Sequence, residues 1–155
     1  MKMKPIGRVS SEIRSPGKMV FACERGREAD NISRIIVSKK YMDGLAGLEK
    51  FSHLWVIYSL HLAKRVEMKT HPGPPSMKNL QRAGIFASRS QYRPNKIALR
   101  LAALQKIEGN VLTVRGLDAV DGTPVLDIKP YVPHFDEPES PVVAEWYQGW
   151  GVGKR

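Results

Sequence analysis

The sequence predicts an all-β protein with little helix, built as a closed barrel or a sandwich. Segments that favour strands are short and rich in β-branched and aromatic residues, and Gly- and Pro-containing corners separate them. Few segments show the 3.6-residue apolar period of an amphipathic helix. A chain of 155 residues is most economically one domain, and it is long enough to bury a substantial core.

Three strands are expected in the first part of the chain. Apolar and polar residues alternate over Lys4–Ile13, and Ile32–Val37 is rich in β-branched residues. Leu54–Leu60 is an apolar run too short for a buried helix, which predicts a buried strand. Between them we expect an irregular loop over Met19–Asn31 and turns, or a single helical turn, over Met42–Lys50.

The second part is expected to begin with a long loop over Ala63–Arg82, which is polar, basic and interrupted by prolines. Lys96–Glu108 has helix-favouring residues, but its apolar side chains alternate and a Gly-Asn turn leads into Val111–Arg115. We therefore predict a β-hairpin. A further strand follows the corner within Asp118–Pro133, and the tail 135–150 is expected to lie across the barrel or against a second subunit.

Composition excludes several classes of protein. Hydrophobic residues make up 42% and charged residues 26%, which is ordinary for a globular domain. No run of 18 apolar residues exists, and the N-terminal sequence has no apolar signal-peptide core. Cys23 is the single cysteine, so an intrachain disulfide is impossible and a reducing cytoplasm is expected.

The net charge of +10 is unevenly distributed. Between His61 and Arg100 there are nine lysines and arginines against the single Glu67. Between Leu117 and Glu145 there are seven acidic residues against Lys129 alone. A basic segment of this density fits a polyanionic partner such as RNA, and it equally fits a solvated surface.

The corner Asp121-Gly122-Thr123-Pro124 is the strongest local signal. Glycine adopts positive φ without steric cost, aspartate bonds to nearby backbone amides, and proline fixes its own φ. Such a stiff corner can place polar groups beside a ligand, and it can also serve only to turn the chain.

A second signal is GIFASRSQYRPNKIALR over Gly84–Arg100, with FSHLWV over Phe51–Val56 and the pair Leu60-His61. Together with the corner, these segments resemble the TrmO family, also called YaeB-like or TsaA-like proteins. The likeness runs from about Ile6 to Tyr131. It implies a mixed β-barrel with a core over 4–133 and a tail over 134–155. It also implies an S-adenosylmethionine-dependent tRNA methyltransferase.

The resemblance further implies a cofactor pocket on the barrel, near the interface of a homodimer. No G-x-G-x-x-G motif occurs, so a Rossmann-type site is not expected. The cofactor-binding positions carried over from the family are Glu24, Arg25, Gly26, Leu60, His61, Arg89, Leu99, Asp121, Gly122, Thr123 and Pro124. Leucines can flank an adenine, and arginine can pair with a carboxylate.

Basic, amide and aromatic residues in and near the motif segment are candidates for binding tRNA. They are Arg82, Tyr92, Arg93, Asn95 and Lys96. The family's methyl acceptor is N6 of threonylcarbamoyl-adenosine beside the anticodon.

The sequence departs from the family pattern near the pocket. The usual Pro-Arg-Gln is Glu24-Arg25-Gly26, the usual Pro-Ile-Gly after Asn95 is Lys96-Ile97-Ala98, and the usual serine after Leu99 is Arg100. These changes bear on substrate identity more than on cofactor binding. Longer bacterial members carry a further C-terminal domain, and we expect the chain ending at Arg155 to lack it.

Three other functions are compatible with parts of the sequence. The same fold could bind S-adenosylmethionine and methylate another acceptor, or a basic module could bind RNA without catalysis. A metal hydrolase would draw on His53, His61, His71 and His134 with Asp121 or Asp127. The histidines have no HxH or HExxH spacing, so no metal site is expected.

Overall fold

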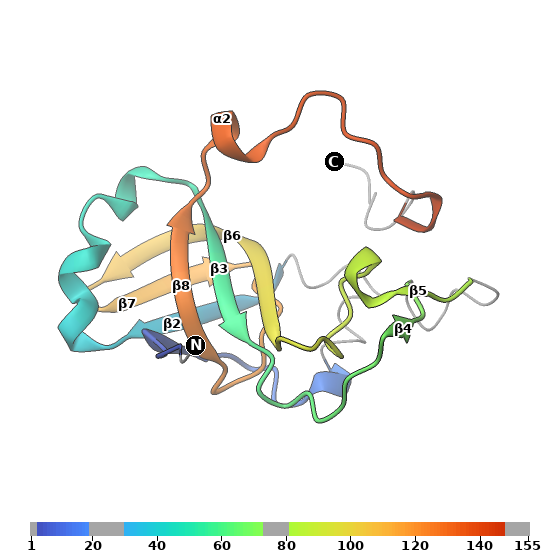
Figure 1. Ribbon diagram of the computed structural model, residues 1–155. Coiled ribbons are helices and arrows are strands. Elements are labelled where there is room, and N and C mark those ends of the chain that lie inside the picture. The colour runs from blue at the N-terminus through green and yellow to red at the C-terminus, as the bar shows by residue number, and fades with distance from the viewer. Residues whose placement is uncertain (1–2, 19–29, 73–80, 148–155) are drawn as a thin grey trace.

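The computed structural model describes residues 3–18, 30–72 and 81–147, and its main body is a closed six-stranded barrel (Figure 1). The strands follow the order β1-β2-β7-β6-β3-β8 around the barrel, and β8 pairs with β1 to close it. All of these pairings are antiparallel. The strands are β1 (Gly7–Ser10), β2 (Ile32–Val37), β3 (His53–Ser59), β6 (Ile97–Glu108), β7 (Val111–Arg115) and β8 (Pro124–Pro130).

The core fills the barrel because alternate side chains of each strand point inward. In β3, Leu54, Val56 and Tyr58 are buried while the residues between them are partly exposed. Ile35 of β2 and Leu112 of β7 are fully buried in the same cluster. Tyr58 is the last inward position of β3, so its hydroxyl reaches the end of the barrel.

At Gly7 the backbone of β1 approaches the backbone of β2 closely. A Cβ at this position would lie 2.4 Å from the backbone oxygen of Ile36, which no side chain can tolerate. The closing ladder between β1 and β8 is short, because it pairs only Gly7 with Val125 and Arg8 with Pro124. Glycine at position 7 therefore permits β1 to pair closely with β2.

Short helical turns cover one end of the barrel. The 3-10 helices η2 (Lys39–Leu45) and η3 (Leu48–Lys50) connect β2 to β3, and Leu45 is buried against the core. After β8 the chain forms one turn of helix, α2 (Pro133–Asp136). It then runs to a final 3-10 turn, η5 (Glu145–Tyr147).

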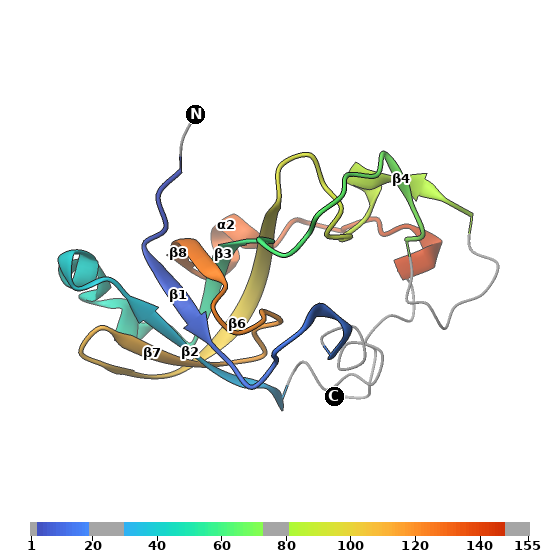
Figure 2. The ribbon, with the colours of Figure 1, turned by 90° about the horizontal axis from the view of Figure 1, so that it is seen from below.

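An arm, residues 64–72 and 81–93, projects from the opposite end of the barrel in both views (Figure 1 and Figure 2). It contains the two-stranded sheet of β4 (Lys69–Thr70) and β5 (Ala83–Gly84), followed by the 3-10 turn η4 (Ile85–Ala87). The tail returns to this arm, where the hydroxyl of Tyr147 accepts a hydrogen bond from the backbone N–H of Arg89 at 3.0 Å.

The predicted β-barrel with few helices is confirmed. The strand predicted over Lys96–Glu108 is β6, so alternation outweighs helix propensity there. The first strand is shorter than predicted, and the loop expected over Ala63–Arg82 is wrong in one detail, because β4 lies within it. The tail was expected on the barrel or a second subunit; within the described residues Tyr147 contacts the arm, and contact with a second subunit stays a prediction.

Candidate functional site

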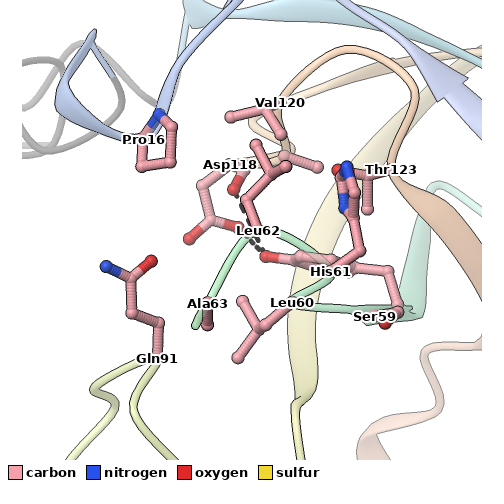
Figure 3. Close-up of a pocket in the computed structure, with 12 residues that line it drawn as sticks. Pro16, Ser59, Leu60, His61, Leu62, Ala63, Gln91, Asp118, Val120 and Thr123 are labelled. Atoms are coloured by element: carbon pink, nitrogen blue, oxygen red, sulfur yellow. Dashed lines mark hydrogen bonds between the residues drawn. The ribbon is translucent and has the colours of Figure 1, made fainter. Parts of the chain in front are cut away.

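A hollow opens where the end of the barrel meets the arm (Figure 3). It encloses about 450 Å³, its solvent-open mouth included. Apolar side chains form most of its wall, and a few polar groups stand among them. The residues that line it are Pro16, Tyr58, Ser59, Leu60, His61, Leu62, Ala63, Gln91, Asp118, Ala119, Val120 and Thr123.

The turn that follows β3 forms one wall. The backbone N–H of Leu60 donates to the carbonyl of Lys96 at 2.8 Å, which ties the turn to the start of β6. The N–H of Ala63 donates to the Leu60 carbonyl at 2.9 Å and closes the turn. Leu60 and His61 are thus presented to the hollow from a backbone held at both ends.

The corner between β7 and β8 forms the facing wall. Gly122 has φ +77°, so the positive φ expected from the Asp-Gly pair is present. The N–H groups of Asp121 and Gly122 donate to the carbonyls of Ile13 and Val9, at 2.7 and 2.9 Å. Thr123 is buried, and its carbonyl accepts from the Val9 N–H at 2.8 Å. These bonds fix the corner to the strand and loop of β1.

The carboxylate of Asp121 is bound within the corner itself. One oxygen accepts from the backbone N–H of Ser11 at 3.0 Å, and the other accepts from the guanidinium of Arg14. Ser11 is buried, so its N–H needs this acceptor. Asp121 therefore joins the corner to the segment after β1, whatever else it binds.

A tyrosine and an aspartate meet inside the hollow. The hydroxyl of Tyr58 donates to Oδ1 of Asp118 at 2.6 Å and lies 3.3 Å from the Asp118 carbonyl oxygen. The Nε of Arg100 lies 4.0 Å from the same carboxylate oxygen and donates to the Gly116 carbonyl at 3.0 Å. A β-bulge in the β3–β8 ladder lies beside Tyr58, as bulges often do at functional sites.

The structure brings together some of the predicted cofactor-binding residues. Leu60, His61 and Thr123 line the hollow. Asp121, Gly122 and Pro124 are neighbours of Thr123 in the corner, but they are not among the lining residues. Glu24, Arg25 and Gly26 lie outside the described residues.

Arg89 and Leu99 lie beside each other, yet neither is among the residues that line the hollow in the described part of the chain. The guanidinium of Arg89 donates to the Leu99 carbonyl at 3.5 Å, and the Leu99 side chain is 43% exposed. Their role in binding the cofactor stays a prediction.

The candidates for tRNA binding lie on the arm and where it returns to β6. Arg82 donates to the Lys69 carbonyl at 2.6 Å, and Arg93 donates to the Ser88 carbonyl at 2.8 Å, so both arginines also hold the arm together. The guanidinium of Arg65 lies 4.2 Å from the ring centre of Tyr92, which covers one face of that ring. The carbonyls of Asn95 and Lys96 accept backbone hydrogen bonds at the start of β6.

Sequence reasoning missed Tyr58, Asp118 and Gln91 as members of the site. Asp118 stands three residues before Asp121, so the motif held a signal for it. Tyr58 occupies an inward position of β3 and is indistinguishable from core without the register. Gln91 comes from the arm, whose position relative to the barrel no local pattern gives.

Two further findings concern metals and membranes. Within residues 3–18, 30–72 and 81–147, no three His, Cys, Asp or Glu side chains gather closely enough to hold a metal ion. Over the same ranges, no helix has the length and apolar character needed to cross a membrane.

Known proteins are similar to this chain in sequence and in fold. The chain is 39% identical to the "Probable S-adenosyl-L-methionine-binding protein" of Methanothermobacter thermautotrophicus, over 88% of this chain and 93% of that protein. It is 38% identical to the "tRNA (adenine(37)-N6)-methyltransferase" of Escherichia coli, over 78% of this chain and 55% of the relative. The rat protein with that name is 37% identical, over 88% of this chain.

The chain spans 32% of the rat protein and 22% of the human one. Among solved structures, one titled "Crystal structure of TrmO" superposes with a TM-score of 0.74 at 30% identity, over 92% of this chain and 62% of that one. The family model of the tRNA-methyltransferase O N-terminal domain matches residues 13–137. This match covers most of the barrel and the arm, and the chain therefore belongs to the TrmO family.

Proposed function

We propose that this chain binds S-adenosylmethionine in the hollow and transfers its methyl group to N6 of an adenosine in tRNA, at the position beside the anticodon. One observation carries the proposal. The turn after β3 and the Asp-Gly-Thr-Pro corner, which lie far apart in the sequence, line one hollow in a chain of the TrmO family. Relatives named tRNA (adenine(37)-N6)-methyltransferase support the reaction, and relatives named S-adenosyl-L-methionine-binding proteins support the cofactor.

The residues of the hollow fit a nucleoside. Leu60, Leu62 and Val120 offer apolar surface against which a flat base can lie. Asp118 and Gln91 add an acceptor and an amide that can bind hydroxyl or amine groups. A mostly apolar wall with a few fixed polar groups is typical of a small-molecule site.

S-adenosylmethionine, when bound, supplies an electrophilic methyl group. The chain's own contribution is to orient, because both walls of the hollow are held by backbone hydrogen bonds. Fixing two reactants in a productive geometry supplies a large part of the acceleration of a bimolecular step. The cofactor-contacting residues in this proposal are Leu60, His61, Arg89, Leu99 and the corner Asp121–Pro124, with Glu24–Gly26 from the early loop.

The finer part of the proposal concerns the acceptor. We propose that the adenosine carries a threonylcarbamoyl group on N6, as the family resemblance implies, and that the basic arm binds the tRNA. Arg82, Arg93 and Lys96 belong to the segment in which cations outnumber acids. Because this segment borders the hollow, it could hold the phosphates of the anticodon loop near the methyl donor.

The test has two stages. Calorimetric titration with S-adenosylmethionine should show one site per chain, and the ligand should raise the melting temperature. The chain should then transfer radiolabelled methyl to tRNA that carries threonylcarbamoyl-adenosine, and nucleoside mass spectrometry should place the methyl group. Binding of S-adenosylmethionine without methyl transfer to any tRNA would reject tRNA as the acceptor, while the proposed cofactor would stand.

A second candidate is a protein of this fold that methylates something other than tRNA. The observation that favours it is length, since the chain covers 93% of two archaeal relatives named as S-adenosyl-L-methionine-binding proteins, without a named acceptor. A third is an RNA-binding module without catalysis. Binding of S-adenosylmethionine separates the third from the others, and methyl transfer to tRNA separates the first from the second.

We also propose that the protein acts in the cytoplasm as a homodimer, with the hollow near the subunit interface. The opposite charges of residues 61–100 and 117–145 support pairing of two copies about a two-fold axis. Sedimentation at micromolar concentration should give twice the mass of the chain. A fully active monomer would contradict the dimer.

A further inference from the structure

We infer that Asp118 presents one carboxylate oxygen to an uncharged O–H or N–H donor of the bound nucleoside, and that Tyr58 positions it. The inference rests on the proposed binding of S-adenosylmethionine in the hollow and names how one part of that ligand is recognised. It concerns a residue of the corner that lies before the Asp-Gly pair.

The backbone on both sides of Asp118 is fixed. Its neighbours Leu117 and Ala119 are buried, at 0% and 2% exposure. The Leu117 carbonyl accepts from the side-chain amide of Asn31 at 2.7 Å, and the N–H of Gly116 donates to the Asn31 carbonyl at 2.8 Å. The chain therefore holds Asp118 at the wall of the hollow with little freedom to move.

The two oxygens of the Asp118 carboxylate have different surroundings. Oδ1 accepts the 2.6 Å hydrogen bond from the hydroxyl of Tyr58, a residue only 4% exposed. Among residues 3–18, 30–72 and 81–147, no hydrogen bond to Oδ2 is found. Figure 3 shows the Asp118 side chain directed into the hollow, on the side where Gln91 lies.

This arrangement selects the kind of group that can bind. An ionised carboxylate only accepts hydrogen bonds, so the ligand must supply the donor. The guanidinium of Arg100, 4.0 Å from Oδ1, already offsets part of the negative charge. A neutral hydroxyl or amine is therefore better suited here than a second cation. On a nucleoside, such donors are the ribose hydroxyls and the exocyclic amine of adenine.

Tyr58 acts through Asp118. Its ring is packed in the core, so its hydroxyl has a fixed position at the end of the barrel. By occupying Oδ1, that hydroxyl sets the rotation of the carboxylate and leaves Oδ2 toward the ligand. Burying the Tyr58 hydroxyl without a hydrogen-bond partner would be costly, and Oδ1 of Asp118 provides that partner. Tyr58 is accordingly a positioning residue.

The experiment compares ligand analogues on matched variants by calorimetric titration. The probes are S-adenosylhomocysteine, its 2′-deoxy and 3′-deoxy analogues, and the analogue with oxygen in place of the exocyclic amine. Asp118→Asn should bind S-adenosylhomocysteine roughly ten- to a hundredfold more weakly than the parent, as expected for a lost charge-assisted hydrogen bond. Asp43→Asn, an exposed carboxylate on η2 at the far end of the barrel, should bind as the parent does.

The analogues identify the donor. The ratio of parent to Asp118→Asn affinity should fall to about one for the analogue that lacks the group bound by Oδ2, and it should persist for the others. Tyr58→Phe should bind S-adenosylhomocysteine more weakly than the parent protein does. It should also discriminate less between S-adenosylhomocysteine and the analogue that lacks the group bound by Oδ2. A purely structural role of the tyrosine would lower affinity for all four probes alike. If Asp118→Asn does not fold, Asp118→Ser provides the same comparison.

Three results would overturn the inference. Unchanged affinity of Asp118→Asn for S-adenosylhomocysteine would show that the carboxylate makes no ligand contact. An equal ratio for all four probes would show that the substitution acts on the wall and not on one donor. Failure of the parent to bind any probe would reject the proposed function, and the inference with it.

Discussion

Replacing Asp121 by alanine should destabilise the whole domain, because its carboxylate joins the corner to the segment after β1. The substitution leaves the N–H of the buried Ser11 without its acceptor, which costs about 1–3 kcal/mol. The lost pair with Arg14 adds less than about 1 kcal/mol, because the arginine side chain is 67% exposed. We expect a total of about 1–4 kcal/mol, which for a domain of this size lowers the melting temperature by roughly 2–15 °C.

Urea denaturation followed by tryptophan fluorescence is the assay, with three matched variants. Asp121→Asn retains an oxygen that can accept from Ser11, so it should lose less than about 1 kcal/mol. Arg14→Ala and the exposed Asp43→Ala should each stay close to the parent. A urea midpoint for Asp121→Ala equal to that of Asp43→Ala would refute the reasoning.

The same variants address the cofactor. If Asp121 serves only the corner, then Asp121→Asn should bind S-adenosylmethionine with the affinity of the parent. A loss of roughly tenfold or more in this stable variant would assign a ligand contact to the carboxylate, in line with the family-derived prediction.

Three other outcomes are expected. Gly7→Ala should disturb the pairing of β1 with β2 and lower the melting temperature, because its Cβ would lie 2.4 Å from a backbone oxygen of β2, whereas Gly44→Ala, in open space, should unfold as the parent does. RNA binding should weaken steeply as salt rises, given the basic segment 61–100, and filter binding that stays flat from low to moderate salt would contradict a phosphate contact. The hydrogen bond to the carboxylate of Glu137 raises the pKa of Tyr131, so the folded state favours the neutral phenol. This stabilisation should be complete below the ordinary pKa of about 10 and lost as pH rises through the raised value. Phenolate absorbance that titrates identically in the parent and in Glu137→Gln would contradict it.

Local patterns carried much of the fold. Alternation over Ile97–Glu108 identified a strand that propensity alone assigns to helix, since its side chains line two faces of a sheet. The Asp-Gly pair identified the corner, because only the positive φ of Gly122 lets the chain turn there. Both signals depend on residues adjacent in the sequence.

The candidate site depends on pairings that no local pattern contains. Tyr58 and Asp118 are 60 residues apart, and they meet because β3 pairs with β8 in one particular register. A shift of one residue would turn the tyrosine outward. Asp118 and Asp121 stand in one short motif, yet Asp118 binds the Tyr58 hydroxyl and Asp121 binds the Ser11 N–H, a difference that only the three-dimensional structure reveals. The resemblance to the family supplied Leu60 and His61, which local reasoning would have assigned to an ordinary strand end.

The short ladder that closes the barrel has a consequence for how the protein captures its ligand. Two residue pairs form the ladder between β1 and β8, and backbone hydrogen bonds from Val9 to Thr123 and from Gly122 to Val9 continue the seam into the corner that is also a wall of the hollow. Short ladders at a sheet seam open at lower free energies than long central ones. A ligand seated against the corner would resist that opening, so amide hydrogens along Gly7–Ser10 should exchange with solvent more slowly once it is bound. Ligand binding and closure of the seam between β1 and β8 would then be energetically coupled in this protein.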